Sequence, residues 1–96
     1  MSPYRLTPAA QRDLSSIWDC TAERWDLRQA ETYVREVQAA IERFAADPSR
    51  GRSVEEVRER YRRYPVGSHL LFSVPRGPGV DIIRILHQRM DPSLHL

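Results

Sequence analysis

The sequence predicts an α+β domain in which an antiparallel two-helix hairpin packs on one face of a small antiparallel sheet. Three observations predict it: a short strand-like run at the start, two stretches of helical periodicity joined almost without a linker, and strand-like runs separated by glycine- and proline-containing turns. A chain of 96 residues suits one domain, so we expect a single domain over residues 1–96.

The first helix is predicted to follow a short strand at residues 2–7, SPYRLT. Thr7 is a suitable N-cap, and Pro8 fits the first helical position, where no amide hydrogen is needed. Four positions share one stripe of this helix: Ala10, Leu14, Ile17 and Thr21. Trp18 lies beside this stripe, so we expect its side chain to be partly exposed.

The second helix is predicted to start at Asp26, three residues before Gln29, a spacing typical of a capping box. Its apolar face has a 3.6-residue period and comprises Ala30, Tyr33, Val34, Val37, Ile41, Phe44 and Ala45. Asp47 and Pro48 end the helix, because a residue before proline disfavours helical dihedral angles. Since almost no linker separates the helices at Trp25, they are expected to lie antiparallel.

The second half predicts a three-stranded antiparallel meander. A polar connection at 48–59 has room for one helical turn at 53–59, and strands are expected at 60–65, 69–74 and 80–87. The last strand, VDIIRILH, shows little alternation, which is typical of a strand covered on both faces in the middle of a sheet. The sheet face away from the helices is expected to be more open, and therefore suited to docking.

The charge pattern and the cysteine count limit the function classes. The net charge is +2, and all 15 basic residues are arginine. Residues 1–48 carry six arginines and eight acidic residues, whereas residues 49–96 carry nine and five, so the second half suits an acidic partner. Cys20 is the only cysteine, which excludes an internal disulfide. Charges near the start and the lack of a long apolar run argue against export and membrane insertion, which predicts a cytoplasmic protein.

The stretch RILHQRMDPSLHL, residues 84–96, contains the residue types of a small ribonuclease. These are two arginines and two histidines: Arg84, His87, Arg89 and His95. In such an enzyme, histidine transfers the proton and arginine stabilises the phosphate. The same residues are also typical of the solvated edge of a small sheet. No set of His, Cys, Asp and Glu residues has the spacing of a metal site.

Five fragments, in this order, resemble the ParE branch of the RelE/ParE toxin superfamily. They are YRLTPAAQRDLSSIWD, AERWDLRQAETYV, DPSRGR, RRYPVGSHLLF and IIRILHQRMD, and together they span essentially the whole chain. The fold of that family agrees with the elements predicted above. The chain departs from many relatives at Cys20, where they have an aromatic residue, at Asp26, where glycine is common, and at Phe72-Ser73-Val74, where FYR is common. These departures indicate an altered surface.

The resemblance implies a toxin of a type II toxin–antitoxin system, held inactive in a hetero-oligomer by direct binding of a cognate ParD-like antitoxin. When free, such a toxin inhibits growth, and DNA gyrase is the implied target. The alternative is a RelE-like ribosome-dependent mRNA endonuclease, and a third hypothesis is an interaction module without toxicity. We expect no cofactor, no metal, no membrane partner and no sequence-specific nucleic-acid binding by the toxin alone.

The nuclease alternative has few suitable residues. RelE-like enzymes use mainly lysine, arginine and a C-terminal tyrosine or histidine, whereas this chain has no lysine and no tyrosine after Tyr64. His95 lies roughly where those enzymes place their terminal acid–base residue, but a penultimate residue tends to fray. We therefore predict no catalytic residue. The residues assigned to target contact and toxicity are Arg84, His87, Arg89 and His95.

Two groups of residues are predicted to contact the antitoxin. On the strand expected at 60–65, Arg60 and Arg62 share one face and Arg63 takes the other. Guanidinium groups suit the carboxylates of an acidic antitoxin, although charges on an edge strand also discourage aggregation. The second group is aromatic and lies on the helices: Trp18, Trp25 and Tyr33. Most aromatic residues at helical spacing belong to the core, but an exposed tryptophan is a typical hot spot for a partner.

Overall fold

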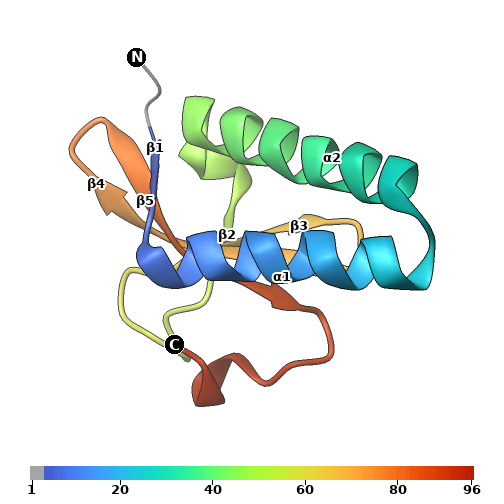
Figure 1. Cartoon of the computed structure of the whole chain (residues 1–96). Coiled ribbons are helices and arrows are strands. Elements are labelled where there is room, and N and C mark those ends of the chain that lie inside the picture. The colour runs from blue at the N-terminus through green and yellow to red at the C-terminus, as the bar shows by residue number, and fades with distance from the viewer. Residues whose placement is uncertain (1–3) are drawn as a thin grey trace.

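The computed structural model describes residues 4–96, and its elements are labelled in Figure 1. In chain order they are β1 (Tyr4–Leu6), α1 (Pro8–Arg24), α2 (Leu27–Ala46), η1 (Pro48–Arg50), β2 (Arg52–Ser53), β3 (Arg62–Val66), β4 (His69–Arg76), β5 (Gly79–His87) and η2 (Pro92–Leu94), where η marks a 3-10 turn. Residues 2 and 3 of the predicted first strand lie outside the described residues. The predicted α+β class is confirmed.

Both helices form as predicted, because side chains satisfy backbone amides at their first turns. Thr7 Oγ1 accepts a hydrogen bond from the Ala10 amide at 3.1 Å, and Asp26 Oδ1 accepts one from the Gln29 amide at 2.7 Å. Only Trp25 and the capping Asp26 separate the two helices. Figure 1 shows α1 and α2 side by side and running in opposite directions, which confirms the helical hairpin.

The sheet has five strands in the order β1-β5-β4-β3-β2. β3, β4 and β5 form the predicted antiparallel meander, and β5 lies inside the sheet between β1 and β4. β1, however, pairs in parallel with β5, in a register that places Tyr4 beside Val80 and Leu6 beside Ile82. The sheet is therefore mixed rather than wholly antiparallel. No tight turn joins β1 to β5, so the turn chemistry that fixes antiparallel neighbours does not set the direction of β1.

The boundaries of β2 and β3 differ from the prediction. β3 begins at Arg62, because Arg60 adopts a left-handed φ of 69° that interrupts an extended strand. Arg60 therefore does not share a strand face with Arg62. Within the predicted polar connection, β2 places Arg52 opposite Arg63 of β3. A single turn follows it, in which the Arg58 amide donates to the Val54 carbonyl at 3.1 Å.

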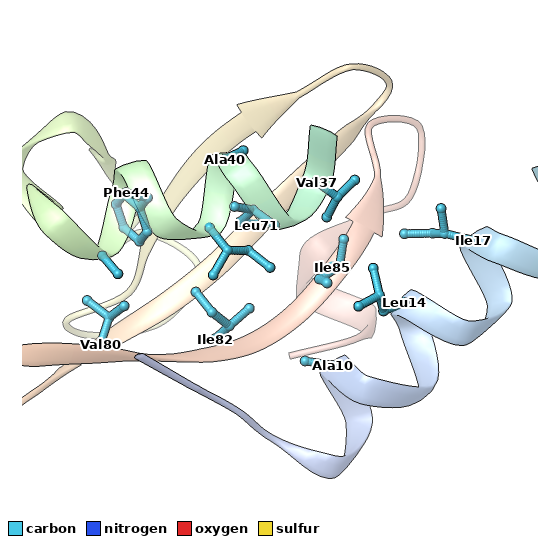
Figure 2. Close-up of a cluster of buried hydrophobic side chains, with 12 residues drawn as sticks. Ala10, Leu14, Ile17, Val37, Ala40, Phe44, Leu71, Val80, Ile82 and Ile85 are labelled. Atoms are coloured by element: carbon cyan, nitrogen blue, oxygen red, sulfur yellow. The ribbon is translucent and has the colours of Figure 1, made fainter. Parts of the chain in front are cut away.

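The main core lies between the helices and the sheet (Figure 2). Its buried residues are Ala10, Leu14, Ile17, Val37, Ala40, Ile41, Phe44, Ala45, Leu71, Val80, Ile82 and Ile85. Phe44 is fully buried and stacks on Tyr64 of β3, with ring centroids 5.3 Å apart. A Cβ at Gly51 would overlap the Phe44 ring, so this position requires glycine. The predicted apolar stripes of both helices thus supply most of this core.

The opposite face of the sheet is partly covered, which corrects the expectation of an open face. Phe72 and Leu86 follow Leu71 and Ile85 in their strands, so they point away from the helices. They form a second cluster with Val54, and the residues packed against it are Val57, Tyr61, Leu70 and Leu96. In Figure 1 the yellow loop before β3 and the red C-terminal segment (residues 88–96) come together below α1. A few apolar side chains in these polar segments fold back onto the sheet.

Candidate functional site

A groove of about 640 Å³ opens between α1, the start of α2 and the adjoining ends of β4 and β5. The side chains that give it its chemical character are Asp13, Trp25, Tyr33, His69, His87 and Met90. Three of them are predicted site residues: Trp25 and Tyr33 were assigned to the antitoxin, and His87 to the target. The groove therefore brings together residues that the sequence assigned to different partners.

Tyr33 connects α2 to the turn between β3 and β4. Its hydroxyl oxygen lies 2.6 Å from His69 Nδ1, accepts a hydrogen bond from the Ser68 amide at 3.1 Å and lies 3.4 Å from the Val66 carbonyl oxygen. Gly67, with φ of 55°, passes so close to the Tyr33 ring that a Cβ would overlap it. Burial raises the pKa of Tyr33, so the phenol stays protonated and can donate a hydrogen bond.

His69 and His87 face each other across β4 and β5, with ring centroids 5.3 Å apart in an edge-on arrangement. His87 Nδ1 accepts a hydrogen bond from the Arg89 amide at 3.1 Å, which leaves its ring proton on Nε2. Burial lowers the pKa of His69, the nearby His87 lowers it further, and Asp13 opposes both effects. The lowered pKa favours the neutral ring, whose Nδ1 accepts a hydrogen bond from the Tyr33 hydroxyl when the ring proton is on Nε2.

Arg84 is already engaged by the protein itself. Its Nε and Nη2 atoms donate to the Asp13 carboxylate at 2.7 and 2.9 Å, and Nη1 donates to the His95 carbonyl at 3.0 Å. Only 24% of the Arg84 side chain and 15% of the Asp13 side chain are exposed. The hydrogen bonds that Arg84 donates to Asp13 raise the pKa of Arg84, so the guanidinium remains charged.

The predicted target-contacting residues do not have equivalent surroundings. Arg84 is held by Asp13, and His87 lies in the groove beside His69, whereas Arg89 is exposed. His95 contributes its backbone carbonyl to Arg84 and follows the η2 turn.

Asp91 fixes the start of the η2 turn. It accepts hydrogen bonds from the amide and the hydroxyl of Ser93 at 2.9 and 2.7 Å. These bonds lower the pKa of Asp91, so the cap stays ionised. The C-terminal segment therefore carries its own local cap.

The arginines near β3 divide between the two faces of the sheet. Tyr64 stacks on Phe44 of α2, so Arg62, two residues earlier, lies on the helix side, where its Nη1 donates to the Gly51 carbonyl at 3.0 Å. Arg63 takes the other face, which confirms the predicted alternation for this pair. Arg60 lies in the exposed turn before the strand.

The structure confirms that the Trp18 side chain is partly exposed, and it exposes Trp25 further. Trp25 is 71% exposed and Trp18 is 36% exposed. Trp25 is the residue that caps the C-terminus of α1, with φ of −120° and ψ of −87°, so the helical period no longer places it on the buried stripe. Leu27, 68% exposed at the start of α2, extends this apolar tip of the hairpin and was not predicted.

Neither Asp13 nor His69 is among the functional-site residues predicted from the sequence. Asp13 lies 71 residues before Arg84 in the chain, and nothing local signals the pairing. His69 is placed opposite His87 only by the register of β4 and β5. Within residues 4–96, no group of three or more His, Cys, Asp or Glu side chains is arranged to hold a metal ion. No helix in the described part of the chain is long and apolar enough to cross a membrane.

The chain is similar along nearly its whole length to known toxins. A family model described as ParE toxin of type II toxin-antitoxin system, parDE, matches residues 4–92. Toxin ParE1 of Mycobacterium tuberculosis is 52% identical over 96 residues, covering 99% of this chain and 98% of that protein. Toxin ParE1 of Caulobacter vibrioides is 46% identical over 96 residues, covering 100% and 99%.

A solved structure supports the same fold. The chromosomal ParDE TA system from P. aeruginosa contains a chain that matches with a TM-score of 0.78, over 91% of this chain and 96% of that one. The two sequences are 20% identical, so this likeness concerns the arrangement of helices and strands.

Proposed function

Since this chain belongs to the ParE toxin family of type II toxin–antitoxin systems, we propose that it stops growth by binding its target rather than by catalysis. In this proposal DNA gyrase is the target, and a ParD-like antitoxin neutralises the toxin by binding it directly. The target surface is the C-terminal segment with Arg89 and His95, and the antitoxin occupies the groove.

The engagement of Arg84 is the observation that carries the proposal of binding. A ribonuclease needs cations around a phosphate, with an acid and a base within hydrogen-bond reach. Arg84 directs all the nitrogen atoms of its guanidinium to Asp13 and His95, and His69 is paired with Tyr33. These commitments favour a surface that recognises a partner over one that cleaves RNA.

The groove suits a partner because it combines exposed apolar surface with polar groups that fix orientation. Trp25 and Met90 expose 71% and 43% of their surface at its rim, and Tyr33 and His69 form a hydrogen-bonded pair within it. Large aromatic side chains at such a rim are typical hot spots. Arg62 and Arg63, on opposite faces of β3, are proposed as further contacts for an acidic antitoxin.

Purified toxin tested in a gyrase supercoiling assay and in a translating extract distinguishes binding from cleavage. We expect inhibited supercoiling and intact mRNA. Arg89→Ala should raise the toxin concentration for half inhibition at least tenfold, whereas Arg43→Ala, an exposed arginine in the last turn of α2, should not. Cleaved mRNA would overturn the proposal in favour of a RelE-like nuclease. If induced expression of the toxin caused no growth arrest, only the hypothesis of an interaction module without toxicity would remain.

Antitoxin affinity tests the role of the groove. Trp25→Ala should weaken binding of the antitoxin about 30-fold or more, because a hot-spot side chain contributes about 2 kcal/mol or more. Leu27→Ala is the matched control, since Leu27 is nearly as exposed but does not line the groove. Equal losses for both variants would place the antitoxin on the tip of the hairpin instead.

A further inference from the structure

Asp13 is the point at which α1 meets β5 and, through Arg84, the C-terminal segment. Its Oδ2 accepts hydrogen bonds from Arg84 Nε at 2.7 Å and from the Ile85 amide at 2.9 Å, and its Oδ1 accepts one from Arg84 Nη2 at 2.9 Å. Nε and Nη2 of Arg84 therefore both donate to the Asp13 carboxylate, and this charged, bidentate contact fixes the rotamer of Arg84.

The remaining arm of Arg84 reaches the C-terminal segment. Nη1 donates to the His95 carbonyl at 3.0 Å, immediately after η2. The other hydrogen bonds of residues 91–96, within the described part of the chain, stay inside those residues: the amides of Leu94, His95 and Leu96 donate to Asp91 and Pro92, and Ser93 bonds to Asp91. Arg84 is thus the hydrogen-bonded tie between η2 and the sheet.

An apolar contact is the second tie. Leu96 packs against the cluster of Val54, Phe72 and Leu86. An apolar contact by one side chain limits how far the segment moves away, but it is not directional. The hydrogen bond from Arg84 is directional, so it determines how the turn is oriented.

We infer that Asp13 is a positioning residue of the toxin: it holds Arg84, and Arg84 in turn orients the C-terminal segment. Without the Asp13 carboxylate, the guanidinium loses its counter-charge in a partly buried place and turns toward water, which releases the His95 carbonyl. This inference rests on the proposed function in one respect, namely that the C-terminal segment contacts the target. Asp13 then controls toxicity without touching the target.

Three variants test the inference in the full-length chain. Asp13→Asn removes the charge at almost unchanged volume, and Arg84→Lys keeps the charge but loses the fork. Asp19→Asn is the matched control, an exposed aspartate on the same helix. The first readout is the NMR backbone order parameter of Ser93, Leu94 and His95, and the second is inhibition of supercoiling by gyrase.

We expect the order parameters of η2 to fall from about 0.85 to below about 0.6 in Asp13→Asn and Arg84→Lys, with no change in Asp19→Asn. The concentration for half inhibition should rise at least tenfold in the first two variants. Unchanged order parameters in both would overturn the inference. Lower order parameters with full inhibition would support positioning by Asp13 and contradict the proposal that this segment contacts the target.

A measurement on the unmodified protein covers the case in which the variants do not fold. The Arg84 Nε proton should exchange with water at least tenfold more slowly than that of the exposed Arg43, because Asp13 accepts it in a partly buried place. Equal exchange rates would show that the contact is not maintained in solution, and would overturn the inference.

Discussion

The backbone groups along one edge of β5 have different hydrogen-bond partners in the two halves of the strand. From Val80 to Ile82, strand β1 supplies a parallel ladder of backbone hydrogen bonds. Beyond Ile82 the strand β1 has ended, and side chains replace it. Thr7 Oγ1 donates to the Ile83 carbonyl at 2.8 Å, and the Asp13 carboxylate accepts from the Ile85 amide at 2.9 Å.

Only the second half of β5 depends on particular side chains for these hydrogen bonds. A backbone ladder tolerates most side chains, because every residue except proline carries the same donor and acceptor. A side-chain cap is lost with a single substitution. The half of β5 that depends on such caps is also the half that lines the groove and leads into the C-terminal segment. The end of β5 that lines the groove is therefore the end more sensitive to substitution.

The largest effect is expected in the ladder half, from Ile82→Ala. Ile82 is fully buried in the main core, and truncating such a side chain lowers the free energy of unfolding by about 2–5 kcal/mol. Ile83→Ala, at the partly exposed neighbouring position, should lower it by less than half as much. Urea unfolding at constant m-value measures both. Equal losses would mean that the two halves do not differ in packing.

Thr7→Val tests a side-chain cap of the second half. The variant keeps the shape of the side chain but removes the donor to the Ile83 carbonyl and the acceptor for the Ala10 amide. We expect a loss of about 1–3 kcal/mol in the free energy of unfolding. Thr32→Val, on the exposed face of α2, is the control and should change it by less than about 0.5 kcal/mol. A loss as small as that of the control would show that the hydrogen bonds of the Thr7 side chain do not stabilise this end of β5.

A pH-dependent contribution to stability should come from His69 of β4, which lies opposite His87 at the end of β5. The pKa of His69 is lowered in the folded protein from its ordinary value of 6.5, so the unfolded chain binds the proton more readily. The contribution of His69 to the free energy of unfolding is therefore fully present above about pH 6.5. It is lost as the pH falls through about 6.5 toward the lower pKa that His69 has in the folded protein. Asp13, His87 and Tyr33 are the groups that face this ring.

Thermal unfolding between about pH 7 and pH 5 measures this loss. Over this pH range the Tm of His69→Gln should fall less than the Tm of the wild type. The difference between the two falls should be smaller than the loss of Tm that Thr7→Val causes at neutral pH. His95→Gln is the control, because His95 contacts Arg84 through its backbone carbonyl. A slope unchanged by His69→Gln would show that this ring does not titrate differently in the folded state.

The smallest effect is expected from Arg5→Ala in the ladder half. Arg5 of β1 pairs with Asp81 of β5 at 3.2 Å, but 58% of its side chain is exposed, so water screens the pair. The free energy of unfolding should fall by less than about 1 kcal/mol. High salt should make the variant and the wild type more alike. A loss as large as that of Thr7→Val would mean that the ladder half also depends on single side chains.

The sequence predicted what local chemistry determines. The start of α1 at Pro8 and of α2 after Asp26, and the stop before Pro48, follow from capping and proline rules that act within a few residues. The order of the meander follows from short turns. The aromatic residues of the core face, such as Phe44, follow from helical periodicity.

The remaining features depend on contacts between distant parts of the chain. The parallel pairing of β1 with β5 and the contact between Asp13 and Arg84 join residues more than 70 positions apart. The second cluster around Phe72 depends on Val54 and Leu96, which stand in polar segments without any period. For the same reason the sequence assigned both Arg84 and His95 to target contact, whereas the fold pairs Arg84 with Asp13.

The pairing of β1 with β5 has a consequence for the synthesis of the protein. Arg5 and its cross-strand partner Asp81 are separated by 76 residues, which a ribosome adds in about 4–15 seconds. The contacts between α1 and α2 join residues close in the sequence, so the hairpin is expected to form early, whereas β1 waits for β5. During this interval the nascent chain lacks both the closed sheet edge and the Arg84 anchor. A newly made chain is therefore expected to complete its sheet and its groove only after β5 has left the ribosome.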